Sequence, residues 1–216
     1  MHEAEIKSFD TVSDNEVITR ILAGEKSMYE LIMRRYNRCL FRIGLSILKN
    51  KTDVEDAMQE TYVKAYQHLH NFQYRSSLLS WLVRILINES LLKQKRQSRF
   101  KSIDGSVIVF DTDLTIENET PEQSLLNREL KNVLEQAILE LPADYSQVYI
   151  MREVEQMSVK ETSDCLGISE ANVKVRLNRA KVMIREFLST VFSEADIFAF
   201  HLIRCNRIVA HVMARI

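Results

Sequence analysis

Apolar residues recur at three- and four-residue steps along most of the chain, the pattern of amphipathic helices. Several expected helix starts carry a hydroxyl residue followed three positions later by Glu or Gln, as in a capping box. These are Ser13–Glu16, Thr52–Glu55, Thr120–Gln123 and Ser158–Glu161. Together the signals predict helices over residues 14–23, 27–48, 53–68, 77–99, 121–139, 143–155, 159–166, 170–189 and 195–214.

The helical pattern is interrupted between Ser102 and Glu119, where acidic residues accumulate and basic residues are absent. A basic run, Lys93–Lys101, comes directly before it. This change in composition indicates a domain boundary. We therefore predict an all-α protein with two small helical domains, 13–101 and 121–190, joined by a flexible acidic linker, 102–120. A C-terminal helical extension, 191–216, is expected after the second domain, which should be a four-helix domain.

Composition supports an all-α fold, since the 216 residues include only four Gly and two Pro, with 46% apolar and 27% charged residues. The net charge of -1 excludes a uniformly basic surface, so any contact with nucleic acid would use local basic patches. The three widely spaced Cys residues favour buried free thiols in a reducing cytoplasm. No apolar run is long enough to span a membrane, and the N-terminus does not resemble a signal peptide.

One pair of possible metal ligands, His201 and Cys205, has helical i, i+4 spacing. Two ligands are too few for a metal site, so ordinary packing is the better interpretation. We expect no metal and no cofactor.

A helix–turn–helix is predicted between Glu161 and Lys181. Gly167 supplies the positive φ that ends one helix, and Ser169 caps the next. On the second helix Val173, Leu177 and Ala180 have core spacing, and the exposed side is basic. Such a helix suits the DNA major groove. The side chains expected to project outward are Asn172, Lys174, Val175, Arg176 and Arg179.

The predicted helix at 53–68 has an acidic face. Clustered acids could chelate a metal or form an acid–base pair, but no His or second acidic cluster is near in sequence. A solvated helix face is the usual explanation. A docking face for a basic partner is the third interpretation, and it would comprise Asp53, Asp56, Gln59 and Glu60.

An aromatic loop precedes the predicted helix at 77–99 and consists of Phe72, Gln73, Tyr74, Arg75, Ser76 and Ser77. Polar residues then form one stripe along that helix: Ser77, Ser80, Arg84, Asn88 and Lys95. Aromatic rings that stack on bases, next to cations that meet phosphates, are typical of single-stranded DNA binding. Trp81 has core spacing, and we expect it to pack inside.

These motifs resemble two regions of bacterial sigma factors. Asp56-x-x-Gln59-Glu60, the Phe72 loop, Trp81-Leu-x-Arg84-Ile and Asn88 resemble region 2. Leu141-Pro142 followed by the helix–turn–helix resembles region 4. Because no domain lies between them, the chain resembles the extracytoplasmic-function (ECF) group over about Ser13 to Leu188.

The resemblance implies a transcription initiation factor that is not an enzyme. The acidic face would bind the clamp of core RNA polymerase, and the Phe72–Ser77 loop would take a flipped base of the minus-ten element. The Arg84–Asn88 stripe would hold the surrounding strand. The second helix of the helix–turn–helix would read the minus-thirty-five element. An anti-sigma factor is a further expected partner. The loop departs from the family pattern, because Gln73-Tyr74-Arg75 stands where a Gly and an acid are more frequent.

Two other functions were weighed. A free-standing helix–turn–helix regulator with an N-terminal sensing domain would explain the second domain, but it leaves the aromatic loop and polar stripe without a role. An enzyme is disfavoured because the sequence has no Gly-rich phosphate loop, His-Glu-x-x-His, Cys-x-x-Cys or nucleophile elbow.

Overall fold

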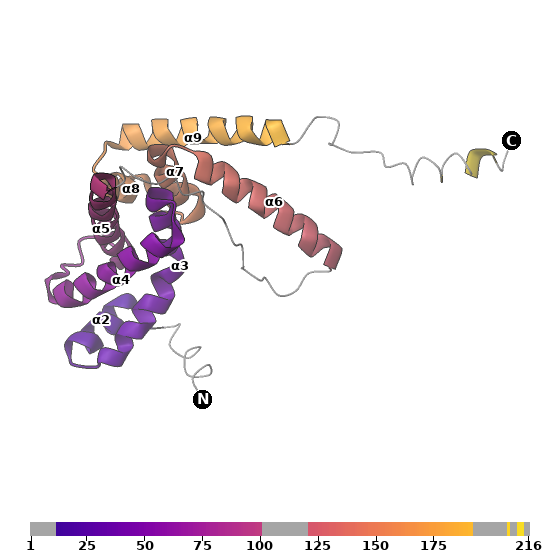
Figure 1. Ribbon diagram of the computed structural model, residues 1–216. Helices are drawn as coiled ribbons and strands as arrows, with labels where there is room; N and C mark the ends of the chain where they lie inside the picture. The colour runs from indigo at the N-terminus through magenta and orange to yellow at the C-terminus, as the bar shows by residue number, and fades with distance from the viewer. Residues whose placement is uncertain (1–11, 101–120, 192–206, 208–210, 214–216) are drawn as a thin grey trace.

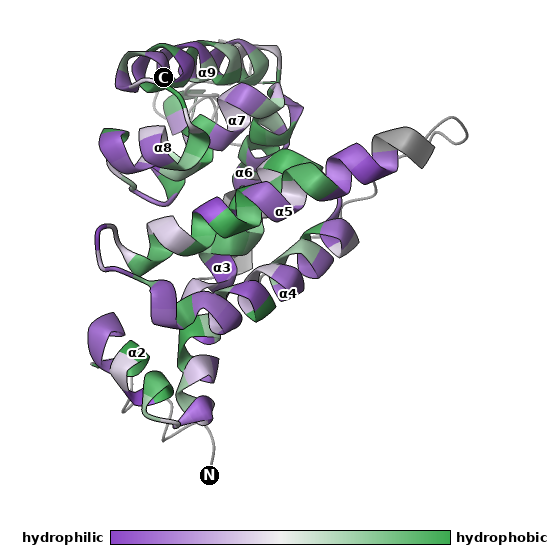
Figure 2. Cartoon of the chain, turned by 90° about the vertical axis from the view of Figure 1, so that its left-hand side faces the viewer, coloured by the Kyte–Doolittle hydropathy of each residue, from purple (hydrophilic) through white to green (hydrophobic). Residues whose placement is uncertain are grey.

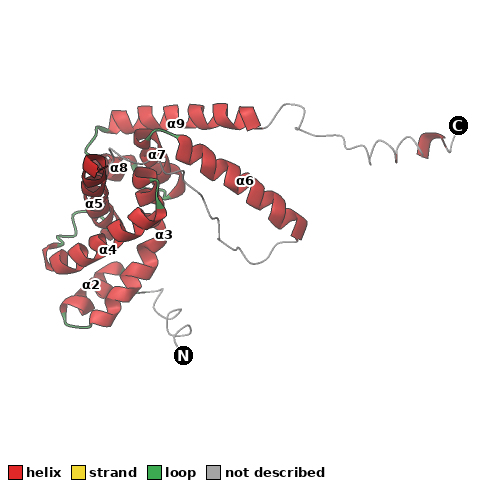
Figure 3. Cartoon of the chain, in the orientation of Figure 1, coloured by secondary structure: helices red, strands yellow, loops and turns green. Residues whose placement is uncertain are grey.

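The computed structural model describes residues 12–100, 121–191, 207 and 211–213, and every regular element among them is helical (Figure 3). The predicted linker and most of the C-terminal extension, including His201 and Cys205, lie outside these residues. In chain order the elements are α2 (Asp14–Leu22), η1 (Lys26–Met28), α3 (Tyr29–Leu48), α4 (Lys51–His68), η2 (Leu69–Asn71), α5 (Leu78–Phe100), α6 (Pro121–Glu140), α7 (Ala143–Tyr149), η3 (Ile150–Val154), α8 (Val159–Leu166) and α9 (Glu170–Val191).

The first domain is built on the mutual packing of α3, α4 and α5 (Figure 1). Its core consists of branched aliphatic side chains that are fully buried, among them Ile43, Val54 and Leu82. Gly44 lets α3 and α4 approach closely, because a Cβ at this position would lie 2.8 Å from Val54 Cγ1. The packing therefore positions α4 and α5, the two helices of this domain that carry predicted site residues.

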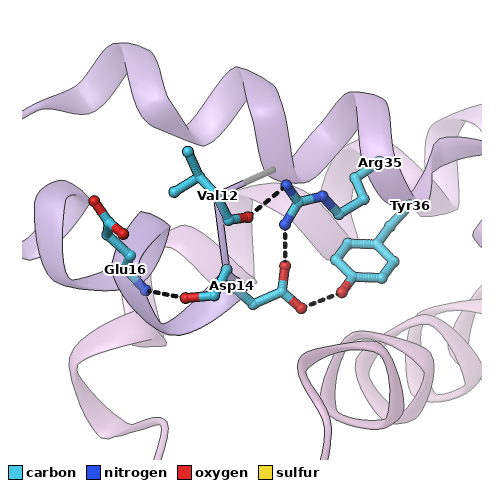
Figure 4. A network of polar contacts seen from close by, with 6 residues as sticks. Val12, Asp14, Glu16, Arg35 and Tyr36 are labelled. Atoms are coloured by element: carbon cyan, nitrogen blue, oxygen red, sulfur yellow. Dashed lines mark hydrogen bonds and ion pairs between the residues drawn. The ribbon is translucent and has the colours of Figure 1, made fainter. Parts of the chain in front are cut away.

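A polar network attaches α2 to α3 (Figure 4). The Asp14 carboxylate accepts hydrogen bonds from the Arg35 guanidinium and from the Tyr36 hydroxyl, and Arg35 Nη2 also donates to Val12 O at 2.9 Å. Ser13 Oγ accepts from the backbone N–H of Glu16, which caps α2 as its sequence predicts. Burial and the Asp14 partner raise the pKa of Tyr36, so its hydroxyl stays protonated and donates.

The second domain contains α6, α7, α8 and α9, and its helix–turn–helix has the predicted local structure. Ser158 and Glu161 form a complete capping box at the start of α8. Gly167 ends that helix with φ 65°, and Ser169 Oγ accepts from the backbone N–H of Asn172 at 3.2 Å. Val173 and Ala180 are fully buried on the inner side of α9.

Two differences from the predicted helix boundaries have a clear local cause, and the other boundaries in the described residues agree within two residues. Helix α4 begins at Lys51, because Asn50 in an extended conformation caps it through Oδ1 to the Asp53 N–H at 3.0 Å. Thr52 is therefore not the N-cap, and the Thr52–Glu55 prediction is wrong. The helix predicted over 143–155 is α-helical only to Tyr149 and then widens into the π-helical turn η3.

The two domains stack on each other, as Figure 2 shows with α7, α8 and α9 above α3 and α5. Helix α3 packs against α7 and η3, while α5 packs against α8. Buried side chains of both domains belong to one continuous hydrophobic cluster. The start of α5, with Ser77 and Ser80, therefore lies against the second domain.

Membrane-spanning helices and metal-binding clusters were both sought in the described part of the chain. No helix there is long and apolar enough to cross a membrane. No group of three or more His, Cys, Asp or Glu residues in that part is arranged to hold a metal ion.

Candidate nucleic-acid interface

The aromatic loop forms one wall of a small open hollow. The Phe72 ring is 9% exposed and lies 5.3 Å from the Trp81 ring and 4.9 Å from the Tyr74 ring. The hollow has a volume of about 180 Å³, below the ~300–1,000 Å³ of pockets for drug-sized ligands. Its lining combines two aromatic rings with cationic and polar groups: Asn71, Phe72, Gln73, Arg75, Ser76, Trp81 and Arg84.

Arg84 is held in place at the rim of this hollow. Its Nη2 donates to Ser76 Oγ at 2.8 Å, and its Nε lies 3.4 Å from the carbonyl oxygen of Ser80. Tyr74 adopts φ 55°, a left-handed conformation that is unusual for a residue with a side chain, and its ring is 49% exposed. The loop therefore presents one exposed ring, that of Tyr74, and its Arg75 lines the hollow together with Arg84 of α5.

The predicted polar stripe is divided in the structure. Asn88 is exposed farther along α5, as is Lys95. At the other end Ser77 Oγ and Ser80 Oγ donate to Glu161 Oε1 of α8, at 2.9 and 3.2 Å. Ser80 is 2% exposed and is therefore covered, whereas Ser77 next to it stays exposed.

The five predicted DNA-contacting residues of the basic helix α9 differ in whether a neighbouring helix engages them. Lys174 and Val175 are exposed, Asn172 is half-buried, and Arg179 is exposed with Nη1 3.4 Å from the Tyr145 hydroxyl. Arg176 instead forms an ion pair of 3.0 Å with Asp144 of α7.

The acidic face of α4 is partly engaged by α5. Lys93 Nζ lies 3.1 Å from Asp53 and 2.6 Å from Asp56, and Gln97 donates to Asp53 at 2.7 Å. Burial alone would lower the pKa of Lys93, but hydrogen bonds to Asp56 and Asp53 outweigh it and raise that pKa. Gln59 and Glu60 are exposed on the same face.

Two family models match the chain, one in each domain. The model described as "Sigma-70 region 2" matches residues 32–100, and the one described as "Sigma-70, region 4" matches residues 131–184. Among similar proteins, the RNA polymerase sigma-H factor of Pseudomonas aeruginosa is 26% identical over 187 residues, covering 84% of this chain and 97% of the relative. The ECF RNA polymerase sigma-E factor of Haemophilus influenzae is 27% identical over 181 residues, covering 81% and 95%. The chain belongs to the ECF type of RNA polymerase sigma factors.

As an ECF sigma factor, this protein directs RNA polymerase to promoters through its regions 2 and 4, and it is not an enzyme. Solved structures share its fold. "Structure of CnrH in complex with the cytosolic domain of CnrY" matches with a TM-score of 0.55 and 21% identity, covering 82% of this chain and 97% of that chain. The sigma factor RpoE of Bartonella quintana, in complex with the anti-sigma factor NepR, matches with a TM-score of 0.61 and 21% identity, covering 74% and 96%.

Sequence reasoning missed several residues of the interface. Asn71 and Trp81 line the hollow although neither was predicted to face it, and Asn178 is exposed on α9. Trp81 satisfies both interpretations, because it is partly buried against the core and also borders the hollow. Glu161 was recognised only as a cap. Its second role depends on α5, more than eighty positions earlier in the chain, and no local signal could have revealed it.

Proposed function

We propose that this sigma factor captures a flipped base of the minus-ten element in the hollow between the Phe72–Ser77 loop and α5. The observation that carries this proposal is the aromatic wall of Phe72 and Trp81 beside the Arg75 and Arg84 guanidinium groups. Stacking would hold the base, and the cations would meet the phosphates on either side. Asn88 and Lys95 would follow the strand along α5.

Base capture of this kind would couple melting to recognition. Separating stacked base pairs costs roughly 1.4 kcal/mol per step. A pocket that accepts one extruded base offsets this cost only when the base fits. The protein itself would therefore break no bond, and the polymerase would supply the remaining affinity.

For the minus-thirty-five element, we propose that the outer face of α9 enters the major groove. Asn172, Lys174, Val175 and Arg179 are available on this face, and the exposed Asn178 extends it. Arg176 must exchange its Asp144 partner for DNA if it is to contact bases. Val175 offers an apolar surface suited to a thymine methyl group.

Lys174→Ala is expected to relax the preference at particular upstream positions, at a cost of ~1–3 kcal/mol on the best sequence. Arg185→Ala, near the other end of the same helix, is the matched control. It should weaken binding to all promoters alike and lower the salt dependence of binding by about one phosphate contact. Equal effects of Lys174→Ala on every promoter would mean that α9 holds the backbone and does not read bases.

We also propose that core polymerase binds the acidic face of α4. Lys93 pairs with both Asp53 and Asp56, but the Asp53 side chain is 21% exposed and that of Asp56 is 58% exposed; Gln59 and Glu60 are exposed as well. Asp56, Gln59 and Glu60 would therefore contact a basic partner directly, and Asp53 would fix the position of α5 beside them. Ion pairs that a solvent-exposed acidic helix face makes with a partner add little binding free energy in water. Apolar contacts next to these ion pairs would therefore have to contribute to the affinity.

Co-purification with core polymerase tests this surface. The double variant Asp56→Lys with Glu60→Lys should lose binding and keep native circular dichroism. Glu55→Lys, exposed on the same helix but outside the proposed set, is the matched control. Retention of the double variant by polymerase at the level of the control would refute the assignment.

An anti-sigma factor is the remaining proposed partner. The similar RpoE structure was solved with a protein named as such a factor. In the present chain the two proposed DNA-binding surfaces belong to different domains, so one inhibitor that spans both domains would block them together. Cleavage of the chain within residues 105–119 should then weaken the inhibitor's affinity, and unchanged affinity would refute the two-domain mode.

A further inference from the structure

An apolar stripe on α6 loses its cover toward the start of the helix. Ala137 and Ile138 are buried, whereas Leu134 and Leu130 are 37% and 52% exposed. Steps of three and four positions separate these residues, so they share one side of the helix. The packed side of α6 therefore continues into an uncovered one.

The neighbouring helix α9 shows the same change toward its own end. Ile184 is buried, Phe187 and Leu188 are half-buried, and Val191 is 45% exposed. Helices α6 and α9 pack against each other, and they spread apart toward these ends in Figure 1. We call this set of residues the region 4 apolar face: Leu130, Leu134, Phe187, Leu188 and Val191.

A face of this kind requires a covering element. Single exposed apolar residues are common on proteins, but a contiguous apolar face generally marks a contact surface. We propose that residues 192–216 of this chain cover the region 4 apolar face as an additional helix of the second domain. The proposal concerns the packing of region 4 and does not depend on the assignment of its DNA contacts.

The sequence of this segment has the pattern that the face requires. Its apolar residues recur at alternating four- and three-residue steps, which predicts one apolar side of a helix: Phe198, Leu202, Cys205, Val209, Val212 and Ile216. Arg207 falls on the opposite side by the same spacing, and it is exposed in the structure. Ser193 and Asp196 have the spacing of a capping box, so the sequence predicts a new helix after the end of α9.

The segment also starts in the right place and is long enough. Helix α9 ends at Val191, a member of the region 4 apolar face, so the segment leaves the helix beside that face. A helix rises about 1.5 Å per residue, so about 20 residues span ~30 Å, whereas α6 from Leu130 to Ile138 is ~12 Å long. A helix that turns back after α9 can therefore reach the whole face.

The described part of the segment fits this pairing. Residues 211–213 are helical, and Val212 and Met213 are 50% and 64% exposed. An amphipathic helix of this length is marginal in water and gains most of its stability by packing its apolar side. Pairing would remove both uncovered apolar surfaces from water.

The signs of charge agree with the pairing. Helix α6 has four acidic and two basic residues, whereas residues 192–216 have two acidic and three basic residues. Opposite net charges on the two partners favour their approach, although exposed ion pairs of this kind add little to affinity. The apolar contact would therefore supply the stability, and the charges would favour this partner over a like-charged one.

Cys205 provides a probe of the pairing in the unmodified chain. It belongs to the predicted apolar side of the segment, whereas the other two cysteines, Cys39 and Cys165, are buried in the structure. Its rate of reaction with a maleimide is measured in the full-length chain and in a synthetic peptide of residues 192–216, with the modified cysteine assigned by mass spectrometry. We expect the rate in the chain to be about tenfold lower, because only the undocked fraction reacts.

Substitutions in the region 4 apolar face test where the segment docks. The double variant Leu130→Asp with Leu134→Asp should raise the rate at Cys205 to nearly that of the peptide, and Val191→Asp on α9 should do the same. Leu22→Asp is the matched control, because Leu22 is an apolar residue of the first domain that is 53% exposed. It should leave Cys205 protected. Circular dichroism verifies that each variant keeps its helices.

Three results would overturn the proposal. Equal rates at Cys205 in the wild-type chain and in the peptide would show that the segment is not docked. Protection that persists in both variants of the face would place the segment against another part of the chain. Protection that grows with protein concentration, together with a dimer in size-exclusion chromatography, would show that a second copy covers the face.

Discussion

Tyr74 offers a substitution that separates DNA binding from folding. Its backbone has φ 55°, its ring is 49% exposed, and the ring centroid lies 4.9 Å from that of Phe72. Tyr74→Gly removes the exposed ring of the Phe72–Ser77 loop, which lies next to the hollow and contacts its Phe72 wall. It also places the residue best suited to a left-handed conformation at this position.

The effects on folding nearly cancel. A left-handed conformation costs an L-residue with a side chain about 1–2 kcal/mol, and Gly removes this cost. Against that, Gly loses about 0.5–1 kcal/mol more backbone entropy on folding. Loss of the edge-to-face contact with Phe72 costs a further ~0.5–1.5 kcal/mol. The free energy of unfolding should therefore change by no more than about 1.5 kcal/mol.

The effect on binding should be larger. Truncation of an aromatic side chain that stacks on a base costs about 1–3 kcal/mol, which corresponds to a loss of affinity of about 5- to 150-fold. The assay is binding of holoenzyme to a forked promoter DNA whose minus-ten element is single-stranded. The promoter sequence is obtained by mapping the transcripts that the reconstituted holoenzyme initiates.

Two further variants sharpen the experiment. Tyr74→Phe keeps the ring and should bind almost as the wild type does, whereas Tyr74→Asn tolerates the left-handed backbone without a ring and should resemble Tyr74→Gly. Wild-type affinity of a folded Tyr74→Gly holoenzyme would refute the stacking role. An equal loss on a duplex that contains only the upstream element would identify a general defect instead.

Three other changes have defined outcomes. Gly44→Ala would bring a Cβ to 2.8 Å from Val54 Cγ1 and should lower the free energy of unfolding in urea by about 1–3 kcal/mol, with partial recovery when Val54→Ala is added. Asp14→Asn removes the carboxylate charge that binds both Arg35 and Tyr36 of α3. It should lower the free energy of unfolding by ~1–2 kcal/mol, after allowance for partial exposure, and should speed amide hydrogen exchange throughout α2. The pKa of Glu161 lies below its ordinary value of 4.5, chiefly because a backbone N–H of its capping box donates to the carboxylate. The contribution of this carboxylate to folding stability is therefore complete above about pH 4.5 and is lost as the pH falls through the folded pKa. Glu161→Gln should accordingly lower the Tm at neutral pH, and the difference from the wild type should shrink as the pH is brought to about 3; a difference independent of pH would refute this cause.

Local sequence signals predicted the elements whose geometry is decided within a few residues. The turn at Gly167 and the caps by Ser158 and Ser169 are correct because each depends on contacts of three or four residues. The start of α4 shows the limit of such rules. Thr52 fits the capping-box pattern, yet Asn50 takes the cap because its backbone is extended there and its side chain reaches the Asp53 N–H.

Side-chain direction was less accessible from the sequence. Periodicity placed Arg176 on the outer face of α9, but an acid of α7, Asp144, draws it into an ion pair. Asp53 was expected to stand free with the other acids of α4, but α5 supplies Lys93 and Gln97 as partners. In both cases the helix is correct and the partner comes from another helix, which pattern rules along one segment cannot include.

The domain interface extends the same reasoning to contacts between the two domains. Arg42 of α3 and Lys49, which follows the last residue of that helix, contact the second domain through Glu155 and the carbonyl oxygen of Leu141. Both partners lie more than ninety positions later in the chain, so no local pattern could have revealed these contacts. Arg42→Glu should loosen the contact between the domains and leave promoter preference unchanged, because the residues proposed to contact bases lie elsewhere. A change in preference caused by Arg42→Glu would contradict this separation of roles.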